Sequence, residues 1–226
     1  MKFILFFLII PFICFAQSEP EQKLSFKVAE VKGEVFRNNE ENGWTPVKNG
    51  DVLSDNTQIL TGLHSSLSLD LTEKSYITIS QLSDVVLQTT RIKKFTLTTE
   101  IYIVSGMIIT SSERLQDLDN EINVMFINGK ATLKNAAGQI YMRKGYGVTL
   151  LAENGDIEIE QNILRKNVKR KIYPGDKCLL KMNGQLVENH KIVEHEMFMS
   201  KSLNDSSAKD FFSRTKSKNS YSVNSR

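Results

Sequence analysis

The sequence is poor in cysteine. Its 226 residues contain two cysteines, Cys14 and Cys178. Cys14 lies in an apolar N-terminal segment that we expect to be removed, which leaves Cys178 without a partner for an internal disulfide. Cys178 lies in a stretch that is typical of a β-strand, and we expect it to be a buried, small apolar residue.

Histidines and catalytic patterns are also scarce. Of the three histidines, His190 and His195 are five positions apart, which places them on different faces of a helix. A zinc site needs three or four ligands at a fixed spacing, and the sequence contains neither that pattern nor a glycine-rich phosphate loop. We therefore expect a protein that is not an enzyme and that uses no cofactor or metal ion.

Long apolar runs are absent beyond the first residues. Lys2, the apolar residues 3–15 and the small-x-small end at Ala16 predict a signal peptide over residues 1–16, and hence export to the periplasm or the outer cell envelope. No transmembrane helix is expected in the mature chain. The alternative is a lipoprotein acylated at Cys14, although residues 11–13 are Pro-Phe-Ile rather than the small residues that usually precede such a cysteine.

A β pattern dominates what is present. Residues 66–71 alternate strictly between serine or aspartate and leucine, as in a strand with one buried and one solvated face. Similar short stretches recur about every 8–12 residues with turn residues between them. This pattern predicts an all-β fold, either solenoid-like or sandwich-like.

The composition changes at two places along the chain. A polar, acidic gap over residues 111–120 predicts a boundary between a first β domain, residues 24–110, and a second β unit, residues 121–187. From residue 188 onward a short helix is expected over residues 190–199. A basic, serine-rich tail without a globular fold is expected to follow, up to residue 226.

One arrangement of glycines occurs twice. Gly33 begins a strand and Gly50-Asp51 forms a turn 17 residues later, and the same order separates Gly155 from Gly175-Asp176 by 20 residues. A short acid after a turn glycine accepts backbone N–H groups, so both aspartates are expected to stabilise turns rather than to act in catalysis. If the repeat is real, the two turns occupy equivalent positions in the fold.

The total charge is nearly balanced, with 29 Lys and Arg against 26 Asp and Glu, which argues against a nucleic-acid partner. A basic cluster is the local exception. Its members are Arg165, Lys166, Lys169, Arg170 and Lys171. The cluster predicts a contact for an anionic partner, and the competing interpretation is a solvated loop.

An ordered set of short motifs resembles the FecR domain, a family named for the ferric-citrate regulator of Gram-negative bacteria. In chain order the motifs are Gly33-Glu34-Val35, Trp44-Thr45-Pro46-Val47, Gly50-Asp51-Val52-Leu53, Ile59-Leu60-Thr61-Gly62 and the strands at residues 65–69 and 75–79. Ser83, residues 85–87 and Gly106 extend the match, which covers residues 28–110 well and the second half only loosely.

The resemblance implies an all-β periplasmic domain. The family's regulator passes a signal from a TonB-dependent receptor to a cytoplasmic sigma factor. This chain has a predicted cleavable signal in place of the regulator's cytoplasmic segment and internal membrane helix, so control of a sigma factor does not follow.

Together these features predict a non-enzymatic binding or signalling module of the periplasm or envelope. The expected partner is an envelope protein or a cell-wall component. The alternative is a structural or assembly component of the cell envelope that associates through strand edges. The sequence leaves the oligomeric state open.

Overall fold

The computed structural model describes residues 22–39, 43–163, 166–183 and 185–188. These residues form eighteen β-strands and no helix, which confirms the predicted all-β fold. The predicted signal peptide, the helix expected over residues 190–199 and the basic tail lie outside the described residues, as does Arg165.

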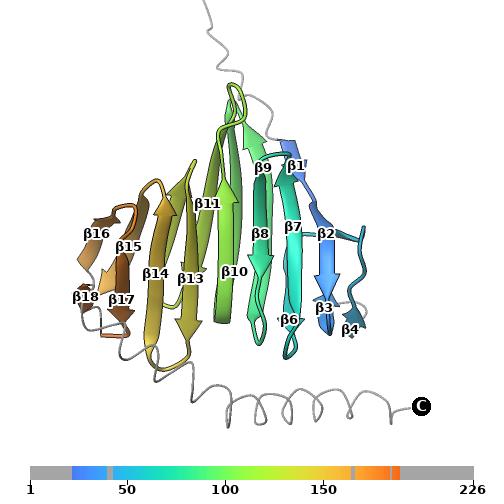
Figure 1. Cartoon of the computed structure of the whole chain (residues 1–226), viewed down its shortest axis with the longest axis horizontal. Coiled ribbons are helices and arrows are strands. Elements are labelled where there is room, and N and C mark those ends of the chain that lie inside the picture. The colour runs from blue at the N-terminus through green and yellow to red at the C-terminus, as the bar shows by residue number, and fades with distance from the viewer. Residues whose placement is uncertain (1–21, 40–42, 164–165, 184, 189–226) are drawn as a thin grey trace, which may run out of the picture.

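The strands form two sheets that share one long strand, β10 (Thr96–Ser112) (Figure 1). In spatial order the first sheet, here called sheet A, consists of β4 (Gly43–Pro46), β3 (Val35–Asn39), β6 (Thr57–Thr61), β9 (Asp84–Lys93), β10, β11 (Asp119–Phe126), β12 (Gly129–Lys134), β15 (Ile157–Ile163) and β16 (Lys166–Ile172). The short β1 (Gln22–Leu24) pairs with the far half of β9.

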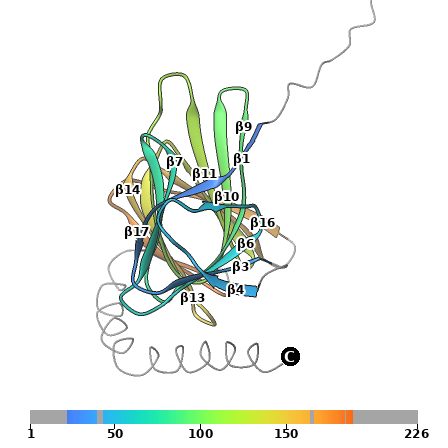
Figure 2. The same cartoon turned by 90° about the vertical axis from the view of Figure 1, so that its right-hand side faces the viewer.

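Sheet B faces sheet A across the core, as the end-on view shows (Figure 2). Its strands in spatial order are β5 (Val52–Leu53), β2 (Phe26–Lys32), β7 (Ser66–Thr72), β8 (Ser75–Ile79), β10, β13 (Ala137–Arg143), β14 (Gly147–Asn154), β17 (Lys177–Lys181) and β18 (Leu186–Glu188).

Strand β10 moves from one sheet to the other at Gly106. Before this residue β10 pairs with β9 and β11 in sheet A, and after it with β8 and β13 in sheet B. Gly106 has φ = +98°, and a Cβ atom there would lie 2.2 Å from Ser83 Oγ and 2.4 Å from Ser83 Cα. Only glycine therefore fits this crossing without displacing backbone.

Buried serines support the chain where it changes sheets, at Gly106 and at Glu34. Ser83 Oγ accepts a hydrogen bond from the Met107 N–H at 3.0 Å. Ser65 Oγ accepts one from the Glu34 N–H at 2.8 Å. Backbone that leaves one sheet for the other loses its ladder partners, and a buried hydroxyl replaces them.

One hydrophobic core fills the space between the sheets. In β7 the leucines at 67 and 69 are fully buried while Asp70 is exposed, which confirms the alternation predicted for this stretch. Residues before and after the 111–120 segment, such as Phe26, Ile108 and Leu150, belong to the same buried cluster. Cys178 is buried in that cluster, as predicted.

The two Gly-Asp turns occupy equivalent positions. The Gly50 N–H donates to the Val28 carbonyl at 3.0 Å, and the Val28 N–H donates to the Asp51 carbonyl at 2.9 Å. In the second copy Gly175 donates to Ala152 at 2.8 Å, and Ala152 donates to the Asp176 carbonyl at 3.1 Å. This matching pair of hydrogen bonds confirms that the sequence repeat is a structural repeat.

The repeated unit closes the two ends of the molecule. In the first copy the Gly50-Asp51 turn bonds to β2, at one end of sheet B. In the second copy the Gly175-Asp176 turn bonds to β14, at the other end (Figure 1). Five consecutive antiparallel pairings separate β2 from β14, so the two strands run in opposite directions. The copies are thus related by an approximate two-fold rotation, and not by the translation of a solenoid. We call them the end caps.

Candidate binding surfaces

The described members of the predicted basic cluster, Lys166, Lys169, Arg170 and Lys171, lie on β16, the outer described strand of sheet A. Residues 166–172 are a strand paired with β15, and not the solvated loop of the competing interpretation. Lys169 forms an ion pair with Glu160, and the Lys171 ammonium lies 2.5 Å from the Asp156 carboxylate. Two of the cluster's charges are therefore matched by acids, Glu160 on the adjacent strand β15 and Asp156 immediately before it.

The ion pairs between the β15 region and β16 also shift the pKa values of three of the paired side chains. The hydrogen bond from Lys169 holds the pKa of Glu160 below its ordinary value, and Lys130 lowers it further. The same bond raises the pKa of Lys169, and the bond to Asp156 raises the pKa of Lys171. Arg170 is exposed and, by strand alternation, points to the opposite face from Lys169. The cluster is thus divided between two faces of an edge strand, and anionic binding remains a prediction.

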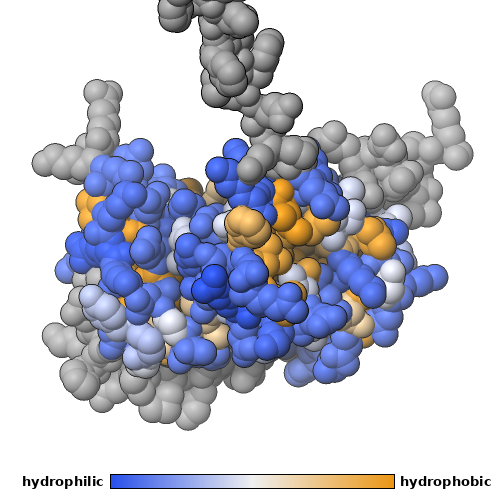
Figure 3. Space-filling view, turned by 90° about the horizontal axis from the view of Figure 1, so that it is seen from above, coloured by the Kyte–Doolittle hydropathy of each residue, from blue (hydrophilic) through white to orange (hydrophobic). Residues whose placement is uncertain are grey.

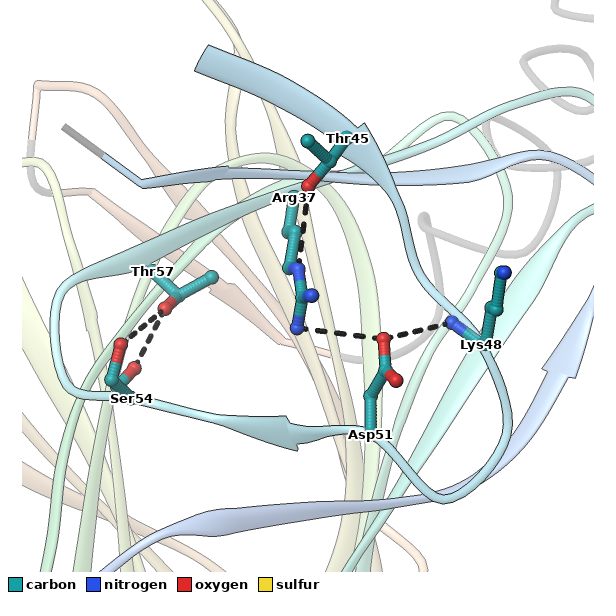
Figure 4. Close-up of polar contacts among 6 residues, drawn as sticks. All are labelled: Arg37, Thr45, Lys48, Asp51, Ser54 and Thr57. Carbon is teal, nitrogen blue, oxygen red and sulfur yellow. Dashed lines mark hydrogen bonds and ion pairs between the residues drawn. The ribbon is translucent and has the colours of Figure 1, made fainter. Parts of the chain in front are cut away.

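The turn at Gly50-Asp51 carries a compact polar network (Figure 4). One Asp51 carboxylate oxygen accepts the Lys48 backbone N–H at 3.1 Å and lies 3.4 Å from the Arg37 guanidinium. Arg37 Nε also donates to Thr45 Oγ1 at 3.4 Å. These contacts confirm that Asp51 stabilises the turn.

A similar local contact follows the turn, where the Thr57 hydroxyl donates to the Ser54 carbonyl at 2.8 Å (Figure 4). The hydroxyl groups of the two residues lie 3.3 Å apart. Together with the Asp51 contacts, these bonds tie β3, β4 and the loop before β6 into one end cap. Their role is structural.

Sequence reasoning missed an apolar surface at the end of the molecule formed by the β9–β10 turn and the connection between β10 and β11 (Figure 1). Phe95, in the turn between these strands, is 71% exposed, the most of any large apolar side chain in the described part. Beside it lies a groove of about 560 Å³, which we call the tip groove. Its lining residues are Thr72, Glu73, Phe95, Leu115, Gln116, Asp117 and Leu118. From above, apolar surface is visible between hydrophilic regions (Figure 3).

Hydrogen bonds fix the turns around the tip groove. The Asp119 N–H donates to the Phe95 carbonyl at 2.8 Å, and the Glu113 N–H donates to the Lys74 carbonyl at 3.2 Å. Within the 113–119 segment, Leu115 and Leu118 exchange two backbone hydrogen bonds of 3.1 and 2.8 Å. The polar, acidic gap at residues 111–120 is therefore an ordered part of this surface.

Asp119 anchors the end of that segment. Its carboxylate accepts a hydrogen bond from the Asn135 side-chain amide at 2.9 Å and lies 3.3 Å from Lys134 and 3.4 Å from Arg114. The bonds from Asn135 and Lys134 hold the pKa of Asp119 below its ordinary value. The segment is thus held by a charged group at its end as well as by backbone contacts.

Two signals in the sequence point to this surface. Phe95 follows Lys93-Lys94 in a short stretch between two strands, where an aromatic residue has no core to enter. Leu115 and Leu118 are the apolar residues of an otherwise polar gap. That these two stretches lie side by side follows from the parallel pairing of β10 with β11, which the pattern of residues does not reveal.

Among the residues that the structure describes, no three His, Cys, Asp or Glu side chains are grouped so as to hold a metal ion. The same residues contain no helix of the length and apolarity needed to cross a membrane.

Comparisons with known proteins give limited likenesses. No protein-family model matches the chain, and no curated protein is significantly similar to it. A crystal structure of a proposed anti-sigma factor from Parabacteroides distasonis has a TM-score of 0.46 and 10% identity over 59% of this chain. A second such structure from the same organism has a TM-score of 0.40 and 8% identity over 76% of it. The chain spans 59% and 60% of the length of these two neighbours, and likenesses this low carry no assignment of function.

Proposed function

We propose that this protein is a non-enzymatic, exported module of the bacterial envelope that binds a protein partner and takes part in signalling. The observation that carries the proposal is the tip groove, an apolar surface on rigidly held turns. Exposed apolar surface that is rimmed by polar residues often marks a protein interface, and aromatic side chains are frequent anchors at such interfaces. The FecR-like motif order over residues 28–110, which forms β2 to β10, supports a periplasmic role of this kind.

Affinity capture tests the proposed function. The full-length protein, tagged at its C-terminus and expressed in its own host, should recover one envelope protein in near-stoichiometric amount after cross-linking. An unrelated exported β protein with the same tag is the control. Recovery of no partner above that control would contradict the proposal.

Export is tested separately by mass spectrometry of the mature N-terminus. We expect a chain that begins at Gln17, immediately after the predicted cleavage site. A lipid-modified Cys14 at the N-terminus would instead support the lipoprotein alternative, and an intact Met1 would contradict export.

The second candidate, a structural or assembly component, is motivated by the edge strands at both ends. The described edges carry features that oppose pairing between copies: Pro46 in β4 lacks a backbone donor, and β16 is rich in lysine. A monomer in light scattering over a wide concentration range would exclude this candidate.

A further inference from the structure

We propose that the tip groove binds an exposed segment of a partner protein in which a large apolar side chain stands next to a lysine or arginine. The inference rests on the proposed binding function and adds the chemistry of the partner. Two properties of the groove lead to it, its apolar wall and its lining charge.

The apolar wall has room for an anchoring side chain. Phe95 is 71% exposed, and the half-buried Leu115 and Leu118 lie with it along the groove. The volume of about 560 Å³ exceeds that of one large side chain. Contact with such a side chain removes apolar surface of both molecules from water, which is the main source of affinity at small interfaces.

The charged residues that line the groove are both acidic. Glu73 and Asp117 are exposed, and within the described residues no ion pair reaches either carboxylate. Lys74 and Lys94 are neighbours in sequence but do not line the groove. A partner segment with a cationic side chain next to its apolar anchor therefore complements the charge of the groove. The two acids would repel a partner that carries a carboxylate at that place.

The groove is already formed in the free protein. The bond between Asp119 and the Phe95 carbonyl joins the β9–β10 turn to the 113–119 segment, and the bond between Glu113 and Lys74 adds the β7–β8 turn. Because three turns are fixed before binding, the partner segment does not have to order them.

The test uses the mature full-length chain and two capped peptides, Gly-Ser-Phe-Arg-Ser-Gly and the same peptide with glutamine in place of arginine. Backbone amide NMR should show shifts on titration at residues 72–73, 94–96 and 115–118. The arginine peptide should bind about two- to fivefold more tightly at low salt, as expected for an exposed ion pair.

Site variants separate the two contributions. Phe95→Ser should weaken both peptides about tenfold or more, because truncation of a central aromatic anchor has effects of this size. Glu73→Gln combined with Asp117→Asn should bring the two peptides to equal affinity. Tyr76→Ser, which removes another exposed aromatic residue outside the groove, is the matched control and should change neither. Unchanged thermal melting shows that each variant is folded.

Several results would overturn the inference. These are equal binding of the two peptides at low salt, shifts confined to other surfaces, or binding that survives Phe95→Ser. Peptide binding that appears only in a Phe211→Ser/Phe212→Ser variant would show that the chain's own C-terminal segment occupies the groove. Flotation with phosphatidylglycerol vesicles that depends on Phe95, without peptide binding, would assign the surface to lipid. If affinity capture succeeds but does not depend on Phe95, this inference fails and the proposed function stands.

Discussion

At the scale of single residues, the fold depends on a few positions where only one side chain is compatible with the backbone. Gly106 allows β10 to leave one sheet and enter the other, and Ser83 meets it there with a hydroxyl that receives the Met107 N–H. Such positions are recognisable only when both strands are known, because neither residue is unusual within its own stretch of sequence.

Gly106→Ala should destabilise the protein by about 2–4 kcal/mol, since the new methyl group overlaps Ser83 backbone and the left-handed φ is strained. Gly145→Ala is the matched control, because Gly145 has φ = +80° and open space around its Cβ position. It should cost about 1 kcal/mol from backbone strain alone. Urea denaturation measures both, and equal losses would contradict the steric role of Ser83.

Asp119 gives a pH dependence of defined sign. Its hydrogen bonds lower its folded-state pKa, so its contribution to stability is present above the unfolded pKa and is lost as the pH falls through the folded value. Wild-type protein should therefore lose stability below about pH 4, and Asp119→Asn should show a smaller loss there. Thermal melting between pH 2 and pH 7 tests this, with Asp70→Asn, an exposed residue on β7, as the control. Parallel curves for wild type and Asp119→Asn would refute it.

At the scale of strands and turns, the sequence predicts where strands lie better than it predicts which strands and turns are neighbours in space. The strict alternation over residues 66–71 predicts β7 and its buried face, because an antiparallel strand with one solvated side shows its pattern directly. The buried positions of β10 change from odd numbers before Gly106 to even numbers after it. The sequence does not reveal the sheet change, because a glycine that interrupts a strand pattern is equally compatible with a bulge or a turn. The tip groove is invisible for a related reason: it combines three turns that are joined only through tertiary hydrogen bonds.

The basic cluster has less free positive charge in the fold than its sequence suggests. In the sequence, five cations within seven residues predict an anion contact, but Glu160 on β15 and Asp156 just before β15 form ion pairs with two of them. The acids are several residues earlier in the chain, so the local pattern overstates the free positive charge.

Removing those acids should reveal the cluster. Asp156→Asn combined with Glu160→Gln should raise the salt concentration at which the protein elutes from heparin, because Lys169 and Lys171 lose their partners. The matched control is Glu34→Gln combined with Asp70→Asn, two exposed acids away from β16, which changes the net charge equally. If both double variants elute at the same salt concentration, the cluster is not neutralised by β15.

At the scale of the whole molecule, the same Gly-Asp turn unit occurs at both ends of the sandwich. The two copies are the end caps, and the other strands lie between them. The two end caps have the same hydrogen bonds and nearly the same φ at the turn glycine, +81° at Gly50 and +85° at Gly175. Both glycines also have open space where a Cβ would stand. The sequence showed the repeat, but the rotation that relates the copies depends on the number and direction of the strands between them.

Because the end caps are equivalent, the same substitution in each cap should lower the free energy of unfolding by the same amount. Gly50→Ala and Gly175→Ala should each lower the free energy of unfolding by about 1 kcal/mol, from the strain of a left-handed φ. The double variant should lose the sum of the two, because the sites lie at opposite ends and share no partner. Urea denaturation of the three variants checks this. Unequal single losses would show that the similarity is confined to the turns.

The opposite orientation of the end caps has a consequence for how such a protein changes length during evolution. A solenoid grows by adding repeats at one end, but in the described part of this sandwich an end cap lies at each end, with only the short β18 beyond the second cap. Additional β-hairpins are therefore accommodated only between the caps, around β10, where two hairpins on facing sheets extend the core without disturbing either end. Homologues that are longer or shorter should differ by hairpins near residues 106–130, while the sequences around Gly50 and Gly175 keep their turns.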